Sequence, residues 1–260
     1  MIIGAISAIG QGLIDSVGAF GAGAVMLLDA LLGLFTKNSR AFKRILDQMA
    51  KVGIESLPIV LITMFFFGMV LGFQTSQIMV RYGAGAYVGM LVAVSIAREG
   101  GPTLAGIVVA ARIGSSFAAE LGSMKITNQI DAMRALATNP VRYLVTPRLI
   151  AAIIMVPLLT IFGDVIGTIG GALVAIDAGI ARQTFFTSAT QFLTVYDIQG
   201  GLIKAAVFGI IIAITSCRVG LNTEGGAAGV GRSTTAAVVW SIVFVYASNF
   251  IMTWLIYKGR

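Results

Sequence analysis

The sequence predicts an all-α integral membrane protein with five transmembrane helices, an N-terminal interfacial amphipathic helix and a short amphipathic helix on the cytoplasmic side. Of its 260 residues 57% are hydrophobic and only 11% are charged, and the mean hydropathy is +0.94. A soluble domain carries about a quarter of its residues as charged side chains. Long apolar stretches separated by basic segments complete the pattern, so we expect one compact membrane bundle.

Five apolar stretches are long enough to cross a bilayer, which needs about 20 residues in a helix. They lie at 57–80, 82–119, 149–176, 200–217 and 236–257. The second is interrupted by Arg98, Glu99 and Pro102, and the third contains Pro157 and Asp164.

The first 35 residues are apolar but are interrupted by polar residues, and no Lys or Arg precedes them as in a signal peptide. Ser7, Gln11 and Asp15 recur every fourth residue and would form one polar stripe on a helix. This pattern favours a helix lying in the membrane interface, although a poorly ordered first span is the alternative.

Residues 37–55 predict a basic amphipathic helix resting on an anionic leaflet. Its apolar stripe consists of Phe42, Ile45, Leu46, Met49 and Val52, opposite Lys37, Arg40, Arg44 and Lys51. We therefore divide the chain into residues 1–55, two helices on the cytoplasmic leaflet, and residues 56–260, the transmembrane domain.

The distribution of Lys and Arg predicts the orientation, because cytoplasmic loops are enriched in these residues. Twelve lie on one side: five in 37–51, five in 112–148 (Arg112, Lys125, Arg134, Arg142 and Arg148), and Arg218 and Arg232. Four lie on the other: Arg81, Arg182, Lys258 and Arg260. The N-terminus is therefore expected in the cytoplasm and the C-terminus outside, with residues 178–199 forming helices at the outer interface.

Several chemistries are excluded by composition. The chain has no histidine and one cysteine, Cys217, so it cannot form a His/Cys metal site, a Ser-His-Asp triad or an internal disulfide. The glycine-rich stretch 220–235 lacks the GxxxxGK[ST] spacing of a phosphate-binding loop. We expect no catalytic residue, no metal and no cofactor on this chain, so any ATP and Mg²⁺ would be bound by a partner.

Arg98 and Glu99 are the first candidate site. We interpret them as an ion pair between apolar runs, and ionisable residues inside a span indicate function by default. The helix is interrupted at the same place by Gly100, Gly101 and Pro102, which leaves backbone groups without intrahelical partners. Such breaks occur where they line a cavity or are buried in protein. The structural alternative is a pair that only pins the kink or lies near the outer surface.

The other polar residues within spans have plainer interpretations. Asp164 lies among Gly163, Gly167 and Gly171, a small-residue packing face, and is expected to be a buried hydrogen-bonding partner. Lys204 either snorkels to the outer surface or touches the transported molecule. Asn249 is expected to hold two helices together.

The segment 126–136 predicts a short amphipathic helix. Thr127 is a candidate cap, Asp131 favours the first turn, and Asn139 and Pro140 would stop the helix. Ile126, Ile130, Met133 and Ala137 align on one side. The pattern alone does not separate an ordinary interfacial helix from one that docks a partner.

Two long motifs and two short ones resemble those of MlaE-type permeases, the membrane subunits of ABC transporters that work with MCE-domain lipid carriers. They are EGGPTLAGIVVAARIGSSFAAELGSMKITNQIDAMRALATNPVRYLVTPR at 99–148, GLNTEGGAAGVGRSTTAAVV at 220–239, and the shorter pair GMVLG at 68–72 and GMLVA at 89–93. The resemblance covers about residues 53–257.

The resemblance implies a homodimer in a bacterial inner membrane, with a cytoplasmic ABC ATPase dimer, a hexamer of MCE-domain proteins outside, and phospholipid or a related lipid as cargo. Positions that match the lining of the family's lipid cavity are Leu71, Ile78, Met79, Tyr82, Arg98 and Glu99; we add Lys204 from its place in the span. The segment with Met124, Thr127, Gln129, Ile130, Asp131 and Met133 matches the coupling helix that docks on the ATPase. Asn128 departs from the Glu common there.

Three rival functions remain at this point. An ion-coupled secondary transporter would use membrane carboxylates such as Glu99 and Asp164. A membrane-embedded hydrolase is disfavoured by the absence of histidine and of paired carboxylates in one motif. A passive scaffold for the MCE ring would tolerate changes at Arg98 or Glu99.

Overall fold

The computed structural model describes residues 21–33 and 39–258, and these are almost entirely helical. Five helical stretches are long and apolar enough to cross a membrane, which confirms the predicted all-α fold with five spans. They are Phe42–Arg81, Gly85–Ile126, Val141–Asp177, Val195–Leu221 and Gly226–Tyr257.

Several of these helical stretches contain more than one helical segment. The first consists of α2 (Ser39–Gly53) and α3 (Leu57–Arg81), and the second of η2 (Gly85–Tyr87), α4 (Val88–Ser95), η3 (Ile96–Gly100), α5 (Gly101–Val109), η4 (Ala110–Gly114) and α6 (Ser115–Ile126). The short α7 (Gln129–Ala135) leads into η5 (Val141–Val145) and α8 (Thr146–Asp177). The chain continues through α9 (Arg182–Phe192), α10 (Val195–Leu221) and α11 (Gly226–Tyr257).

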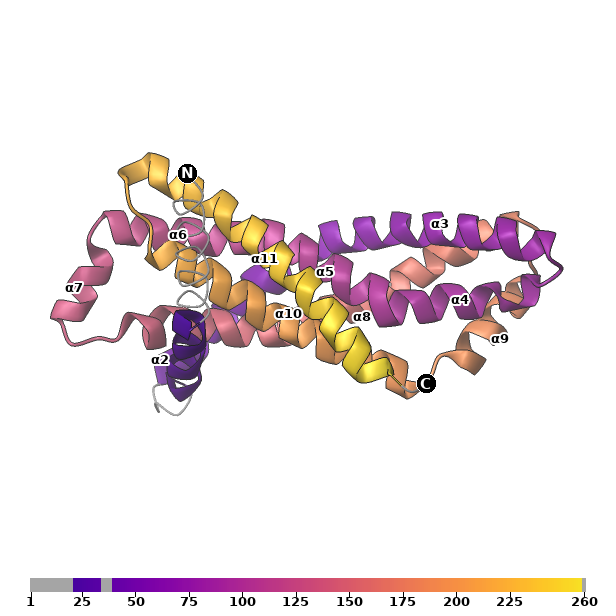
Figure 1. The fold of residues 1–260 in the computed structure, drawn as a ribbon, viewed down its shortest axis with the longest axis horizontal. Coiled ribbons are helices and arrows are strands. Elements are labelled where there is room, and N and C mark those ends of the chain that lie inside the picture. The colour runs from indigo at the N-terminus through magenta and orange to yellow at the C-terminus, as the bar shows by residue number, and fades with distance from the viewer. Residues whose placement is uncertain (1–20, 34–38, 259–260) are drawn as a thin grey trace, which may run out of the picture.

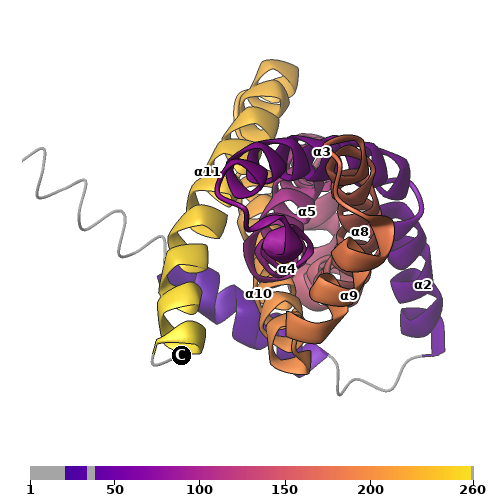
Figure 2. The ribbon, with the colours of Figure 1, turned by 90° about the vertical axis from the view of Figure 1, so that its right-hand side faces the viewer.

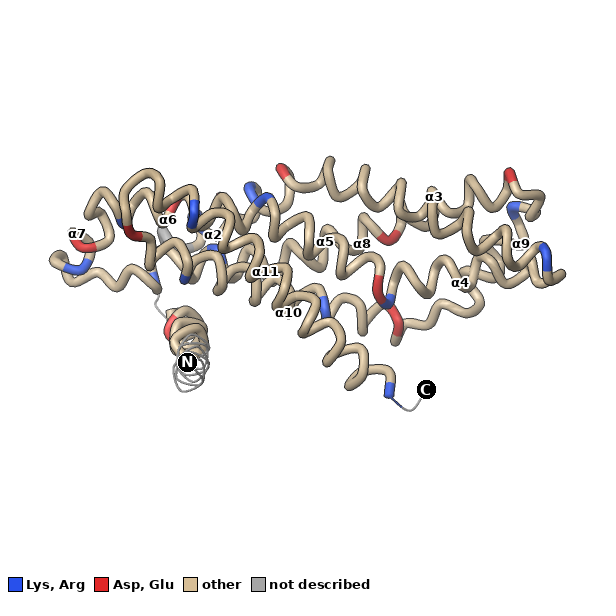
Figure 3. The backbone as a smooth tube through the Cα atoms, turned by 45° about the horizontal axis from the view of Figure 1, so that its top comes forward, with Lys and Arg blue, Asp and Glu red and all other residues tan. Residues whose placement is uncertain are grey.

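The helices form an elongated bundle with α7 at one end and α9 at the other (Figure 1). Seen along its length, α3, α8, α10 and α11 surround the central second span (Figure 2). Helix α11 crosses the bundle obliquely and ends well before the outermost turns of α3, α4 and α8 (Figure 1). Lys and Arg gather at the α7 end, and a second group of charges lies midway along the bundle (Figure 3).

Glycines bring α3 and α8 into backbone contact. A Cβ placed on Gly68 would collide with the carbonyl oxygen of Gly167, and one on Gly72 would lie 2.6 Å from the carbonyl oxygen of Gly171. Small residues allow this approach between membrane helices. The predicted packing face Gly163–Gly167–Gly171 is therefore confirmed, with α3 as its partner.

The described part of the N-terminal region, helix Gly21–Leu32, lies across the long axis of the bundle (Figure 2). Asp29 fixes it to η5 and to the residues just before η5, because its carboxylate accepts from Arg142 Nε at 2.8 Å and from Asn139 Nδ2 at 2.9 Å. Thr146 also donates to the carbonyl oxygen of Ala30 at 2.8 Å. This orientation is the one that an interfacial helix requires; Ser7, Gln11 and Asp15 lie outside the described residues.

The predicted basic amphipathic helix is present as α2, which packs against α8. One part of its apolar stripe is buried in the protein and the other part is exposed. Val52 is fully buried and Met49 packs on the core, whereas Phe42 and Leu46 are exposed. In a protein that spans a membrane, these exposed apolar side chains are suited to contact lipid.

We predict that Gly68→Ala lowers the stability of the bundle, because the added methyl group meets the backbone of α8 rather than a movable side chain. Overpacking of this kind costs about 1–3 kcal/mol. Thermal unfolding of the purified protein in detergent measures the change. Gly21→Ala is the control, since nothing lies within 4 Å of its added Cβ; equal midpoints for the two variants would contradict the close α3–α8 packing.

A second prediction concerns pH. The hydrogen bond from Arg142 holds the pKa of Asp29 below its usual value of 3.8, against the opposing effect of burial. The ion pair therefore stabilises the docked helix fully above pH 3.8 and is lost as the pH falls through the lower folded-state pKa. Proteolysis around residues 21–33 should increase over that range in the native protein, while Asp29→Asn should be equally sensitive at every pH. If proteolysis of the native protein and of Asp29→Asn changed with pH in the same way, this role of Asp29 would be contradicted.

Candidate functional site

The charged break in the second span is built on a π-helical segment, η3, which contains Arg98 and Glu99. Such segments often occur at functional sites, since the extra residue in the turn shifts side chains out of the regular helical register. Helix α5 follows at once, with Pro102, which has no N–H to donate to the preceding turn, at its start.

Arg98 is held by the start of α10. Its Nε donates to Asp197 Oδ1 at 2.7 Å, and its guanidinium carbon lies 4.7 Å from the centroid of the Tyr257 ring. Asp197 is 1% exposed and forms a capping box with Thr194, so its carboxylate has a fixed position. The Arg98 side chain remains 37% exposed, which leaves part of the guanidinium open to the surroundings.

Glu99 is paired with Lys204 of α10 at 2.6 Å. Lys204 is fully buried, and its ammonium also donates to the Arg98 carbonyl oxygen at 3.0 Å and to Thr253 Oγ1 at 2.7 Å. These three acceptors match the three donors of an ammonium group. The other carboxylate oxygen of Glu99 accepts from Asn249 Nδ2 at 2.9 Å, so the cluster joins η3, α10 and α11.

Two sequence expectations need correction here. Arg98 and Glu99 do not pair with each other; neighbouring side chains on the helix point apart, and each carries its charge to a different residue of α10. Lys204 does not snorkel, because acceptors lie within reach inside the bundle. Asn249 does join two helices, as expected.

Sequence reasoning did not identify Asp197, Thr253 or Tyr257 as members of the cluster. The Thr194-x-x-Asp197 spacing resembles a helix-capping pattern and could have placed Asp197 at the start of α10. Thr253 lies four residues after Asn249, which places both on one face of α11. Nothing in the sequence indicates that this face meets the break.

Asp164 does not form the hydrogen bond that was expected. Its Oδ1 is buried without a hydrogen-bond partner, and it occupies the position where a Cβ on Gly101 would lie. Helix α8 thus presents a carboxyl group directly to the glycine that begins α5, and only a residue without a side chain fits at position 101.

The other predicted lipid-cavity residues lie in the second half of α3 or, in the case of Tyr82, directly after it. Ile78 and Tyr82 are 52% and 78% exposed, while Leu71 and Met79 are partly buried against the core. An exposed face on one subunit encloses nothing by itself. The cavity role of these residues, and of Arg98, Glu99 and Lys204, therefore stays a prediction.

The predicted coupling segment forms α7, at the tip of the bundle (Figure 1), but its ends differ from those expected. Thr127 does not cap it: its hydroxyl donates back to the Ser123 carbonyl oxygen at 2.8 Å, and Asn128, in the left-handed region at φ 59°, precedes the helix. Asn139 instead caps the next helix, accepting from Val141 N at 2.9 Å.

The apolar stripe of α7 faces inward. Ile130 is fully buried, and Met124 and Met133 pack on the core, so these side chains attach α7 to the protein. Gln129, Asp131 and Leu136 are exposed, with Leu136 at 78%. Asp131 is bonded to Lys125 at 3.1 Å and to Arg134 at 3.2 Å. A partner that docks on α7 would meet these exposed residues. Leu136 was not among the residues expected to make that contact.

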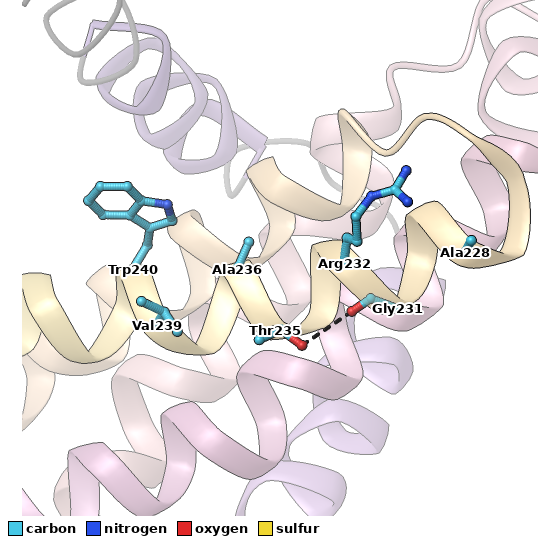
Figure 4. Close-up of a pocket in the computed structure, with 7 residues that line it drawn as sticks. All are labelled: Ala228, Gly231, Arg232, Thr235, Ala236, Val239 and Trp240. Carbon is cyan, nitrogen blue, oxygen red and sulfur yellow. Dashed lines mark hydrogen bonds between the residues drawn. The ribbon is translucent and has the colours of Figure 1, made fainter. Parts of the chain in front are cut away.

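A shallow groove runs along the first half of α11. Arg232 and Trp240 project from the helix there, and Thr235 donates to the Gly231 carbonyl oxygen at 3.3 Å (Figure 4). The same helix exposes Phe250 and Trp254 further on. This long apolar side of α11 packs on nothing in the described chain.

Comparison with known proteins identifies a family of membrane permeases, in agreement with the membrane fold. The family model described as "Permease MlaE" matches residues 45–255. The chain belongs to the MlaE permease family. A probable ABC transporter permease protein of Rickettsia typhi is 46% identical over 215 residues, 82% of this chain and 83% of that protein.

Two further relatives carry more specific names. The intermembrane phospholipid transport system permease protein MlaE of Haemophilus influenzae is 34% identical over 97% of both chains. The chloroplastic protein TRIGALACTOSYLDIACYLGLYCEROL 1 of Arabidopsis thaliana is 39% identical over 84% of this chain and 63% of its own length. This MlaE-family chain is thus a multi-pass membrane protein and an ABC transporter permease, as its motifs predict.

For this permease we predict that Glu99 is energetically coupled to Lys204. In a double-mutant cycle of Glu99→Gln and Lys204→Met, the coupling energy should be about 0.5–3 kcal/mol, as for residues in direct contact. Unfolding of the four proteins in detergent gives this value. The matched cycle of Glu99→Gln and Arg98→Gln should give a smaller coupling energy. A larger coupling energy between Glu99 and Arg98 than between Glu99 and Lys204 would contradict the pairing.

Proposed function

We propose that this chain is the transmembrane permease subunit of an ABC transporter that moves phospholipid between a bacterial inner membrane and an MCE-protein carrier, powered by a separate ATPase. Family membership supports the permease role, and the Haemophilus relative is named for phospholipid transport. The observation that carries the proposal is the charged cluster of Arg98, Glu99, Asp197 and Lys204, built into otherwise apolar spans.

The cluster has the chemistry that a phospholipid headgroup requires. A lipid cavity should be mostly apolar with a few fixed polar groups. Asp197 bonds Nε of Arg98, which leaves the terminal amino groups of the guanidinium to meet a phosphate, a geometry that Arg suits well. The exposed Ile78 and Tyr82 on α3 would contact the acyl chains. Lys204, being buried, would position Glu99 rather than touch the cargo.

A second copy of the chain would complete the cavity. The exposed apolar side of α11, with Trp240, Phe250 and Trp254, is suited to a homodimer interface in the membrane. Closing this face against its copy would enclose space near the Arg98 side chain, because Tyr257 of the same helix stacks on that guanidinium. An MCE-domain hexamer would then receive lipid at the α9 end.

The ATPase dimer would bind at the α7 end. ABC permeases receive the energy of ATP through a contact, and this chain has no nucleotide-binding motif of its own. Lys and Arg residues are concentrated at this end (Figure 3), which supports a cytoplasmic location for it. Helix α7 follows directly from α6, so a movement of α7 would be transmitted into the span that contains the break.

Reconstitution tests the proposal. Liposomes containing the chain, its ATPase and its MCE partner should move fluorescent phospholipid to the carrier when ATP is supplied, and Arg98→Gln should slow this transfer at least tenfold. The chain alone should move no lipid under a proton or sodium gradient. Gradient-driven movement without the ATPase would instead support an ion-coupled transporter.

We also predict that Leu136→Glu, at the exposed position directly after α7, weakens assembly with the ATPase, because a charge replaces an apolar contact of the interface. Asp131→Lys should act in the same direction, since it reverses charge in the first turn of α7. Co-purification measures assembly. Val195→Glu is the control, as Val195 is similarly exposed at the start of α10; equal loss in the control would contradict the role of α7.

A further inference from the structure

A polar cavity that shares no residue with the cluster is not needed by the function proposed above. It has a volume of about 310 Å³ and lies where the end of α2 and the turn before α3 meet η4 and α6. Lys51 and Glu55 line one side, and Arg112, Ser116 and Glu120 line the other. Phe117, which is 1% exposed, contributes an apolar wall.

Two ion pairs cross this cavity. Lys51 Nζ lies 2.8 Å from Glu120 Oε1, and Arg112 Nη2 lies 3.0 Å from Glu55 Oε2. All four side chains are between about a third and a half exposed, so a ligand can reach them. Arg148, which is buried behind the cavity, bonds the other oxygen of Glu120 at 2.6 Å and keeps that carboxylate in place. The lining thus offers two accessible cations and two accessible carboxylates.

The surroundings of the cavity place it at the surface of a bilayer. Helix α2 is amphipathic, and its exposed Phe42 and Leu46 are suited to lipid contact. Ile54, 71% exposed, lies in the turn between α2 and the first membrane-crossing helix α3. Charged side chains beside exposed apolar ones at the start of a span mark the depth of lipid headgroups.

We propose that this cavity binds the headgroup of a resident phospholipid that carries both a phosphate and a primary ammonium group. The phosphate would accept hydrogen bonds from Lys51 and Arg112, in charge-assisted pairs of the strong kind. The ammonium group would then replace those cations as donor to Glu55 and Glu120, and its three N–H bonds are enough to serve both. Every charge in the cavity keeps a partner of opposite sign.

This exchange discriminates among headgroups. An anionic lipid without an ammonium group would leave Glu55 and Glu120 facing its phosphate, which like-charge repulsion disfavours. A quaternary ammonium has no N–H to donate, so the carboxylates would lose their hydrogen bonds. The volume lies at the lower end of the range for small-ligand sites, which suits a headgroup whose acyl chains extend along the outside of α2 and α3.

The bound lipid would connect the N-terminal part of the protein to the span that leads into α7. Lys51 and Glu55 belong to α2 and the turn after it, whereas Arg112 and Glu120 belong to the segments immediately before α7. A headgroup that contacts all four holds these segments together from the membrane side. The site is separate from a cargo cavity at Arg98, and neither cavity shares a residue with the other.

Lipid retention tests the proposal. The full-length chain is purified in detergent with added phosphatidylethanolamine, phosphatidylcholine or phosphatidylglycerol, and native mass spectrometry counts the lipids kept per protomer. The native chain should bind phosphatidylethanolamine about tenfold more tightly than the other two, the effect of one hydrogen bond to a charged group. Glu55→Gln should abolish this preference, because it removes one of the two carboxylates that the ammonium group would serve. Lys51→Gln should weaken the retention of all three lipids, because it removes a partner of the phosphate that they share. Ser116→Trp, which fills the cavity without removing a charge, should also weaken the retention of all three.

The matched control is Lys43→Gln, which removes the same charge from the exposed side of α2 outside the cavity. It should keep both the retention and the preference of the native chain, and unfolding midpoints near that of the native chain verify that the variants are folded. Equal retention of the three lipids by the native chain would overturn the proposal. So would equal loss in Lys43→Gln, or displacement of the lipid by soluble glycerophosphoethanolamine at the same concentration, which would indicate a soluble ligand.

Discussion

The cost of placing charge inside a membrane is the constraint on which this structure depends. An unpaired ionised side chain at the centre of a bilayer is expensive, so charges there are few and partnered. Lys204 shows the consequence most clearly: it is fully buried, and its ammonium has three acceptors drawn from η3 and α11. The remaining Lys and Arg residues are mostly gathered at the α7 end (Figure 3). One rule therefore explains both the polar cluster and the basic end.

The same cluster determines which helices move together. Glu99 contacts residues of α10 and α11 at once, and Arg98 contacts the start of α10. Glycines allow the helices to come this close, since a Cβ on Gly201 of α10 would collide with the Ala97 carbonyl oxygen of η3. A displacement of the break would therefore carry the start of α10 and the end of α11 with it. This gives the permease a mechanical route from α7, through α6 and α5, to the charged cluster.

Much of the fold could be predicted because apolar length and charge placement are properties of single segments. The five spans, the basic helix now seen as α2 and the glycine face of α8 follow from such local patterns. The partners of Arg98 and Glu99 could not be predicted, because Asp197 and Lys204 are about a hundred residues away and only packing brings them close. The inward turn of Ile130 was missed for the same reason: an amphipathic pattern shows that one face is apolar, not whether that face meets its own protein or another.

The claim on which the transport account most depends is that the α7 end lies in the cytoplasm. Single cysteines at exposed positions, Leu136→Cys in the loop after α7 and Val195→Cys at the start of α10, test it directly in a background where the native Cys217 is buried. With an impermeant thiol reagent applied to cells whose inner membrane is intact, we expect labelling at position 195, and labelling at position 136 only after permeabilisation. Labelling of position 136 in intact cells, with position 195 protected, would contradict it.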